Sequence, residues 1–246
     1  MPLIELKKLR KSFGAIVAVN DISFSVEKGE VTGFLGPNGA GKSTTMKMLS
    51  CFLPPDSGTA VIAGNDIINN PVAVRKSLGY VPENVPLYNE MTTAGFLKFI
   101  CDIREIRGSD REKAIDKVID SCALNRVVHQ QIGTLSKGYR RRVGLAQALV
   151  HDPEVLIMDE PTDGLDPNQK SEIRFLIKKM ASDKAIVIST HILEEVEAVC
   201  DRIVLIDRGL IKADGTPEHV CSDCGGSLEK MFQNLTTTET DRKGEK

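Results

Sequence analysis

The chain has 246 residues, of which 41% are hydrophobic and 27% are charged. This balance is typical of a globular protein and argues against disorder. The formal net charge of −2 offers no general attraction for a polyanion. No apolar run approaches the roughly 18–20 residues that cross a bilayer, and the start of the chain does not resemble a secretory signal. Any work at a membrane is therefore expected to need partners.

The first 35 residues predict β-structure. Short apolar or alternating runs at 3–6, 22–26 and 31–35 are bounded by turn residues. A glycine-rich loop follows, and a helix is expected over 42–52, where two prolines stop it.

Between about Met91 and Val150 the apolar residues recur at helical spacing, which predicts helices over 93–104, 110–123 and 139–150. Ser109 and Asp110 are the expected cap of the second helix. Further along, strands at 155–158, 185–189 and 203–206 alternate with helices at 168–180 and 193–199. Such alternation predicts an α/β core with a parallel sheet, interrupted by an all-helical insertion at about 86–150. Residues 236–246 are polar and are interpreted as a solvated tail.

Six cysteines are scattered along the chain, four of them among apolar neighbours. This pattern is typical of free cysteines in a reducing cytosol. Cys221 and Cys224 have zinc-like spacing, but a structural zinc needs about four ligands and no second pair exists. We interpret this pair as part of an incidental loop.

The loop over 36–44 fits the pattern G-x-x-x-x-G-K-[ST]. Its glycines let backbone N–H groups converge on phosphate oxygens, and the following helix directs its positive end at the same anion. Lys42 is expected to neutralise the β- and γ-phosphates and Ser43 to hold Mg²⁺. A chance glycine turn is the alternative, which the flanking strand and helix disfavour. The expected nucleotide-binding residues are Gly36, Pro37, Asn38, Gly39, Ala40, Gly41, Lys42, Ser43 and Thr44.

Asp159 and Glu160 end the strand at 155–158. We expect this strand beside the one that precedes the glycine-rich loop, so that Asp159 holds Mg²⁺ and Glu160 orients and deprotonates the attacking water. Solvated acids at a strand end are the alternative. His191 follows another apolar strand, and its position at the carboxyl edge of the sheet predicts that it reaches the γ-phosphate.

The segment Leu135-Ser136-Lys137-Gly138-Tyr139 resembles the signature of ATP-binding cassette (ABC) proteins. The resemblance covers about residues 3–235 and implies one ABC ATPase domain over 1–235. Its implied fold is a P-loop NTPase cassette with a parallel-sheet core, an antiparallel β subdomain and a helical subdomain insertion. Among ABC proteins, the chain looks most like ATPase subunits of bacterial two-component exporters of the gliding-motility and drug-resistance type.

The resemblance also implies roles for single residues. Phe13 is similar to the aromatic residue that stacks on adenine, and Asp166 lies in the segment that resembles the D-loop. Glu83 stands where the family usually has a glutamine that contacts the γ-phosphate. Its carboxylate can bind Mg²⁺ or water but cannot donate an amide hydrogen bond. His191 looks like the switch histidine.

Ser136 and Gly138 match the signature residues that bind the γ-phosphate of ATP held by another subunit. Lys137 and Tyr139 depart from the usual glycine and glutamine. Since the chain has a single set of motifs, a catalytic assembly needs two copies or a homologous partner. A second copy is the partner that we predict, in a homodimer that sandwiches ATP.

The implied function is Mg-ATP-driven dimerisation and hydrolysis, coupled to export by a separate integral-membrane permease. The chain is expected to be cytoplasmic and peripheral on the cytosolic face of the plasma membrane. Its docking groove is expected between the helical insertion and the Glu83 segment, around residues 84–90.

Two alternatives compete with this function. A soluble ABC ATPase acting on nucleic acid or ribosomes is disfavoured by the single cassette and by the absence of a long heptad insertion. An inactive regulatory cassette conflicts with the intact Lys42, Asp159, Glu160 and His191. The arginines at 140–142 lack interleaved aromatics, which makes them weak evidence for a nucleic-acid partner, and none is expected. We interpret them as a solvated helix face or a permease contact.

Overall fold

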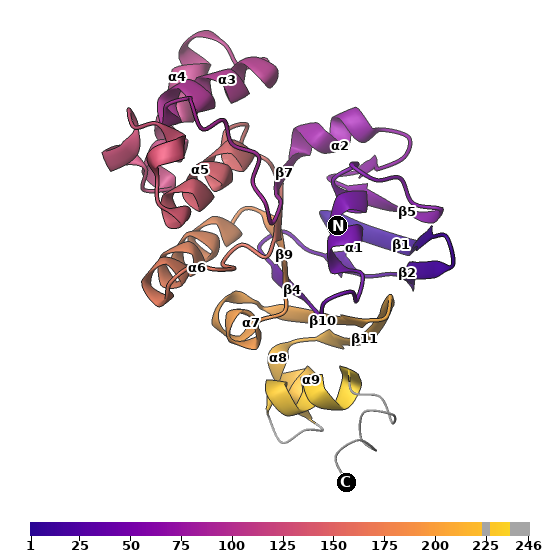
Figure 1. Ribbon diagram of the computed structural model, residues 1–246. Coiled ribbons are helices and arrows are strands. Elements are labelled where there is room, and N and C mark those ends of the chain that lie inside the picture. The colour runs from indigo at the N-terminus through magenta and orange to yellow at the C-terminus, as the bar shows by residue number, and fades with distance from the viewer. Residues whose placement is uncertain (223–226, 237–246) are drawn as a thin grey trace.

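The computed structural model of the protein describes residues 1–222 and 227–236. It contains two β-sheets and a group of helices that projects from one end of the larger sheet (Figure 1). Cys224 and residues 237–246, for which a loop and a polar tail were predicted, lie outside the described residues.

The smaller sheet is antiparallel and has the strand order β2-β1-β5-β6, with β3 also paired to β1. The strand predicted over 22–26 is divided, because Ile22 pairs with Leu9 of β1 whereas Val26 pairs with Ile4. The bounds of these strands are β1 Ile4–Phe13, β2 Ile16–Ile22, β3 Ser25–Val26, β5 Ser57–Ile62 and β6 Asn65–Asp66.

The larger sheet has the order β11-β10-β4-β9-β8-β7, and only its edge strand β11 is antiparallel. Its strands are β4 Val31–Leu35, β7 Leu78–Val81, β8 Val155–Asp159, β9 Ala185–Thr190, β10 Arg202–Asp207 and β11 Leu210–Gly215. The prediction that β8 lies beside β4 was wrong, because β9 pairs with both and separates them. Residue Ser189 of β9 stands opposite both Phe34 and Asp159.

Both faces of this sheet are covered, which is why β4, β8 and β9 are buried along their whole length. On one face, Val155 and Ile157 of β8 pack with α1 (Lys42–Leu49) and the smaller sheet. On the other face, Leu156 and Met158 pack with α5 (Lys137–Leu149) and α6 (Pro167–Ala181). The predicted α/β fold class is therefore confirmed.

The projecting helices are α3 (Thr93–Ile103), α4 (Gly108–Ser121) and α5, and two short 3₁₀ turns, Asn125–Val127 and Ile132–Thr134, lie between α4 and α5. The cap predicted for α4 was wrong. This helix already begins at Gly108, whose positive φ turns the chain into it, so Ser109 lies inside the first turn. Helix α5 begins two residues before its predicted start because the Ser136 hydroxyl accepts a hydrogen bond from the Tyr139 N–H at 3.3 Å.

The remaining helices are short, and α1 ends at Leu49 rather than at residue 52. Near the carboxyl end of the described chain, two helices pack on Leu35, Val196 and Leu205. No helix of the described residues is long and apolar enough to span a bilayer. These short helices are α2 Pro71–Ser77, α7 Leu193–Val199, α8 Pro217–Cys221 and α9 Leu228–Thr236.

His151 is a titratable group inside this framework. Its Nε2 lies 3.0 Å from the Leu78 carbonyl oxygen, so Nε2 carries the proton and donates. Its Nδ1 is buried without a hydrogen-bond partner among the described residues. Burial, helped by Arg104, lowers the pKa of His151 to about 4.

We expect the stability of the fold to decrease in mild acid because of His151. The unfolded imidazole has a pKa of about 6.5, so falling pH protonates the unfolded chain first. The contribution is complete above about pH 6.5 and is lost towards pH 4, by up to about 3 kcal/mol in the free energy of unfolding. Urea unfolding between pH 4 and 7 measures it. His151→Gln should flatten the dependence of the free energy of unfolding on pH, whereas substitution of the exposed His129 by Gln should leave it unchanged. Equal slopes in the wild type and both variants would contradict the assignment to His151.

Candidate functional site

The glycine-rich loop connects the end of β4 to the start of α1 and packs tightly on its neighbours. Gly41 has a φ of 108°, and a Cβ there would overlap the Ala18 carbonyl oxygen. A Cβ at Gly36 would overlap the Ile206 carbonyl oxygen. Since side chains are excluded at both positions, the backbone can curl closely enough to present its N–H groups to one anion.

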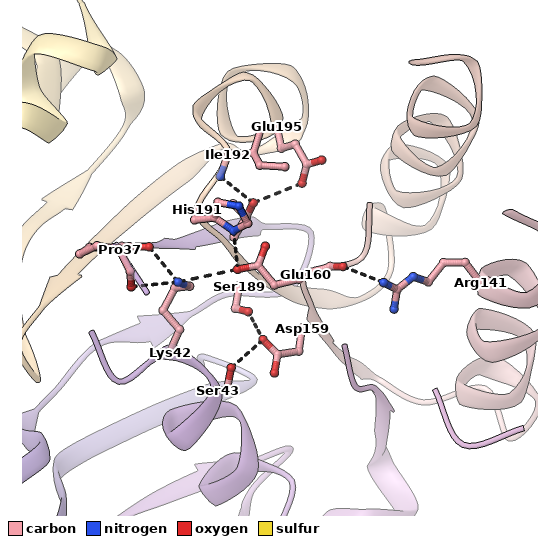
Figure 2. A network of polar contacts seen from close by, with 12 residues as sticks. Pro37, Lys42, Ser43, Arg141, Asp159, Glu160, Ser189, His191, Ile192 and Glu195 are labelled. Carbon is pink, nitrogen blue, oxygen red and sulfur yellow. Dashed lines mark hydrogen bonds and ion pairs between the residues drawn. The ribbon is translucent and has the colours of Figure 1, made fainter. Parts of the chain in front are cut away.

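Lys42, at the start of α1, directs its side chain back over the loop (Figure 2). Its Nζ donates to the carbonyl oxygens of Gly36 at 2.8 Å and Pro37 at 3.2 Å, and lies 3.7 Å from Glu160 Oε1. Burial lowers the pKa of Lys42, whereas the Glu160 and Asp159 carboxylates oppose this shift. The Lys42 ammonium is therefore fixed beside the start of the glycine-rich loop.

Asp159, the last residue of β8, points toward the same loop. Its Oδ1 accepts hydrogen bonds from the Ser43 hydroxyl at 3.3 Å and from the Ser189 hydroxyl of β9. Ser189 was not predicted as a site residue, because a serine inside an apolar strand carries no signal of its own. The arrangement gathers hydroxyl and carboxylate oxygens, which are the ligands that Mg²⁺ prefers.

Glu160 follows Asp159 in a left-handed conformation with a φ of 47°. This conformation is rare for a residue with a side chain and is typical of functional sites. The Glu160 Oε1 atom lies 3.0 Å from His191 Nδ1, within ion-pair distance. The second oxygen, Oε2, is buried and has no hydrogen-bond partner among the described residues. One face of the carboxylate is thus held, and the other can accept a proton or a water.

A cleft of about 440 Å³ opens over these side chains. Glu83, Glu160 and His191 come together in it, although they follow three different strands. Phe13, by contrast, is 51% exposed at the end of β1 and is not among the residues that line the cleft. The lining residues are Ala18, Asn38, Gly39, Gly41, Lys42, Ser43, Thr44, Glu83, Glu160, Asp163 and His191.

Ser136, Gly138 and Asp166 lie elsewhere, in a second cleft of about 580 Å³. Asp166 caps α6 by accepting from the Gln169 N–H at 2.9 Å. A Cβ at Gly138 would lie 2.8 Å from Gln169 Cδ, so a glycine lets the first turn of α5 approach α6. Apart from Phe13, the structure therefore brings the predicted site residues together as two groups, at two separate clefts of one chain.

The comparisons with known proteins place the chain in a family. A family model described as "ABC transporter" matches residues 19–163. The linearmycin resistance ATP-binding protein LnrL of Bacillus subtilis is 37% identical over 225 residues, which cover 91% of this chain and 72% of LnrL. The chain belongs to the ABC transporter family.

Other relatives differ in length. ABC transporter A family member 1 of Dictyostelium discoideum is 38% identical over 218 residues; the match covers 89% of this chain but only 25% of that protein. Among solved structures, CbiO1 from Clostridium perfringens, part of the ABC transporter complex cbiONQ, superposes with a TM-score of 0.83 at 27% identity. That superposition covers 100% of this chain and 99% of CbiO1.

ABC ATPases bind ATP with Mg²⁺ and hydrolyse it, and this chain is such an ATPase. The first cleft fits that ligand. It combines a glycine cradle, a buried ammonium, the Ser43 and Asp159 oxygens, and the buried Glu160 Oε2, which has no hydrogen-bond partner within the described residues. The Ser43 and Asp159 oxygens are of the type that a hard cation such as Mg²⁺ prefers.

The three arginines at 140–142 are not a solvated helix face, so that interpretation was wrong. All three donate to backbone carbonyl groups of neighbouring loops, and Arg141 is only 7% exposed. Arg140 binds the carbonyl oxygens of Ile132 and Gly133. Arg142 also pairs with Glu172 of α6. Carbonyl partners carry no residue-type signal, which is why the sequence did not reveal these contacts.

Ser189→Ala should weaken Mg²⁺ binding, because it removes the hydroxyl that orients the Asp159 carboxylate. Loss of such a supporting hydrogen bond typically costs 10- to 100-fold in metal affinity. We expect the Mg²⁺ concentration for half-maximal ATPase activity to rise by about 10-fold, with the KM for ATP unchanged at saturating Mg²⁺. The buried Ser50→Ala, at the end of α1, is the control. An unchanged Mg²⁺ dependence would show that Asp159 does not need Ser189.

Proposed function

We propose that the chain is the ATP-hydrolysing subunit of an exporter whose membrane channel is a separate permease. One observation carries this proposal: the phosphate loop and the signature line two different clefts of the same chain. A complete site then needs two chains, each closing its signature over ATP held by the other. We take residues 1–235 to form a single ABC ATPase domain that works in this way.

Several residues of the first cleft have a role in this proposal. Bound Mg-ATP would supply the γ-phosphoryl group that is transferred to water. Lys42 would neutralise phosphate charge, Ser43 and Asp159 would hold the metal, and Glu83, which lines the same cleft, would contribute a further oxygen. Glu160 accepts the proton of the attacking water on Oε2.

His191 completes the first cleft. Its Nδ1 holds the Glu160 carboxylate in place at 3.0 Å, and its side chain, 41% exposed, faces the cleft and can contact the γ-phosphate. Phe13, at the end of β1, is proposed to stack on adenine, since its ring is 51% exposed.

The second cleft supplies the remaining contacts. Ser136, at the N-terminus of α5, and Gly138 would bind the γ-phosphate of the partner's ATP, since a helix N-terminus favours negative charge. Asp166 would face the same interface. ATP binding then drives dimerisation, and hydrolysis releases the two chains.

Glu160→Gln tests the dimer. The amide keeps the shape of the side chain but cannot accept the proton of the attacking water, so ATP should persist and hold two chains together. Gel filtration at micromolar concentration should show a dimer with Mg-ATP and a monomer without nucleotide. The double variant Glu160→Gln with Ser136→Arg should stay monomeric, because it blocks the second cleft. A monomeric Glu160→Gln protein in saturating ATP would contradict the sandwich.

A groove of about 920 Å³ supports the permease partner. It lies between the end of α1, helix α2 and helix α3. Its lining does not include the segment 84–90, for which docking was predicted from the sequence. Three apolar side chains on its rim are well exposed: Phe52 at 78%, Val72 at 60% and Ile103 at 61%. Such a cluster of exposed apolar residues is typical of a protein interface. We propose that the permease docks here, on the cytosolic side of the membrane.

Phe52→Asp and Ile103→Asp should prevent this docking. A carboxylate buried against an apolar partner surface would be desolvated without compensation. The expected result is loss of the membrane partner in affinity capture from detergent-solubilised membranes, with an unchanged unfolding temperature. Phe175→Asp, an equally exposed site on α6, should keep the partner. Recovery of only ribosomal proteins or nucleic acid with the unaltered chain would favour the soluble alternative.

A further inference from the structure

Arg141 is a buried cation that the roles given above do not use. It lies in the second turn of α5, and its guanidinium reaches into the core between the projecting helices and the larger sheet (Figure 2). Its Nη1 donates to the carbonyl oxygens of Pro82 at 3.2 Å and Glu83 at 2.9 Å. Its Nη2 donates to the carbonyl oxygen of Glu160 at 3.0 Å.

The three carbonyl groups belong to two segments of the ATP site. Pro82 and Glu83 directly follow β7, and Glu160 directly follows β8, which is paired with β7. A guanidinium is rigid and planar, so it fixes the relative position of all the groups that it binds. Through one side chain, α5 is tied to the ends of both strands.

The contacts leave the catalytic side chains free. Arg141 lies near the carboxylates of Asp163, Glu83, Asp159 and Glu160, which stabilise its charge, yet its hydrogen bonds within the described part of the chain go to backbone oxygens. Burial lowers the pKa of Arg141, but a guanidinium keeps its proton in proteins. The Glu160 carboxylate therefore remains available for His191 and for water.

Glu160 is the residue that most needs such support. Its left-handed backbone is strained and is held by hydrogen bonds on both sides: its N–H donates to the Ser189 carbonyl oxygen at 3.0 Å, and its own carbonyl accepts from Arg141. Removing Arg141 frees one side of this residue. The carboxylate would then sample positions other than the one that faces the cleft.

Close packing keeps α5 at the distance that these bonds require. A Cβ at Gly144, one turn after Arg141, would lie 2.6 Å from Val85 Cγ1. The glycine thus lets the helix approach the segment that follows Glu83. The Arg141 guanidinium and the Gly144–Val85 contact therefore both connect α5 to the segment that follows β7.

We propose that Arg141 is a positioning residue for hydrolysis, which holds the Glu160 backbone and the Glu83 segment in their working arrangement. This inference deepens the proposed function by adding a residue to the same site. It assigns to α5 a direct effect on the ATP bound by its own chain, besides the contact that its N-terminus makes with the partner's ATP.

Arg141→Gln tests the proposal, with Arg140→Gln as a matched control. Both arginines donate to backbone carbonyl groups, but those of Arg140 belong to the projecting helices alone. We measure kcat and KM for ATP, the Kd of a fluorescent ATP analogue and the unfolding temperature of the full chain. Arg141→Gln should lower kcat by roughly 10- to 100-fold with the analogue Kd within about 2-fold, because binding groups stay in place. Arg140→Gln should lower the unfolding temperature with kcat within about 2-fold of wild type.

Two results would overturn the proposal: an unchanged kcat in Arg141→Gln, or equal losses of kcat in both variants. If Arg141→Gln fails to fold, Arg141→Lys replaces it, because an ammonium keeps the charge but cannot span both segments. Its kcat should fall at least several-fold, and a wild-type kcat would refute the role. The ATP-dependent dimer of Glu160→Gln is measured in parallel. Absence of that dimer would count against the proposed function, whereas Arg141 is judged by the ratio of rate constants.

Discussion

The pairing of β9 between β4 and β8 is the constraint on which the ATP site depends. Ser189 of β9 stands opposite Phe34 on one side and Asp159 on the other, so the three strands end together at one edge of the sheet. The phosphate loop follows β4, the carboxylates end β8, and His191 follows β9. Because these strands are parallel and buried on both faces, a slip in register would exchange side chains between two packed faces and disrupt both. The core therefore sets the spacing of the catalytic groups.

At this edge of the larger sheet, buried cations and carboxylates balance one another, and the Glu160 side chain stays available for reaction. Lys42 and Arg141 are buried cations on opposite sides of Glu160, and both hydrogen-bond to carbonyl oxygens. Asp159 and Glu160 supply the opposing charge. A buried charge without a partner is costly, whereas shared partners lower that cost. The result is a site in which Glu160 Oε2 keeps an unused acceptor position.

The sequence predicted much of this site because its signals are local. The spacing of Gly36–Thr44 and the acids at the end of β8 predict a phosphate loop and a metal carboxylate without knowledge of the fold. Adjacency in the sheet is not local, which is why β8 was placed beside β4. Contacts between a side chain and distant backbone carbonyl groups are equally invisible, since any residue can supply a carbonyl. Arg141 was therefore interpreted as solvated, although it is buried among three of them.

Helix α5 joins the two clefts because Ser136 and Arg141, which contact one cleft each, lie only five residues apart. Ser136, its cap, lines the second cleft, and Arg141 holds the loops that border the first. A helix turns every 3.6 residues and does not stretch, so a displacement of its N-terminus is carried to Arg141 with little loss. Closure of a partner on Ser136 would thus act on the backbone of Glu160 in the same chain. The two ATP sites of a dimer would then be coupled through a single rigid element in each subunit.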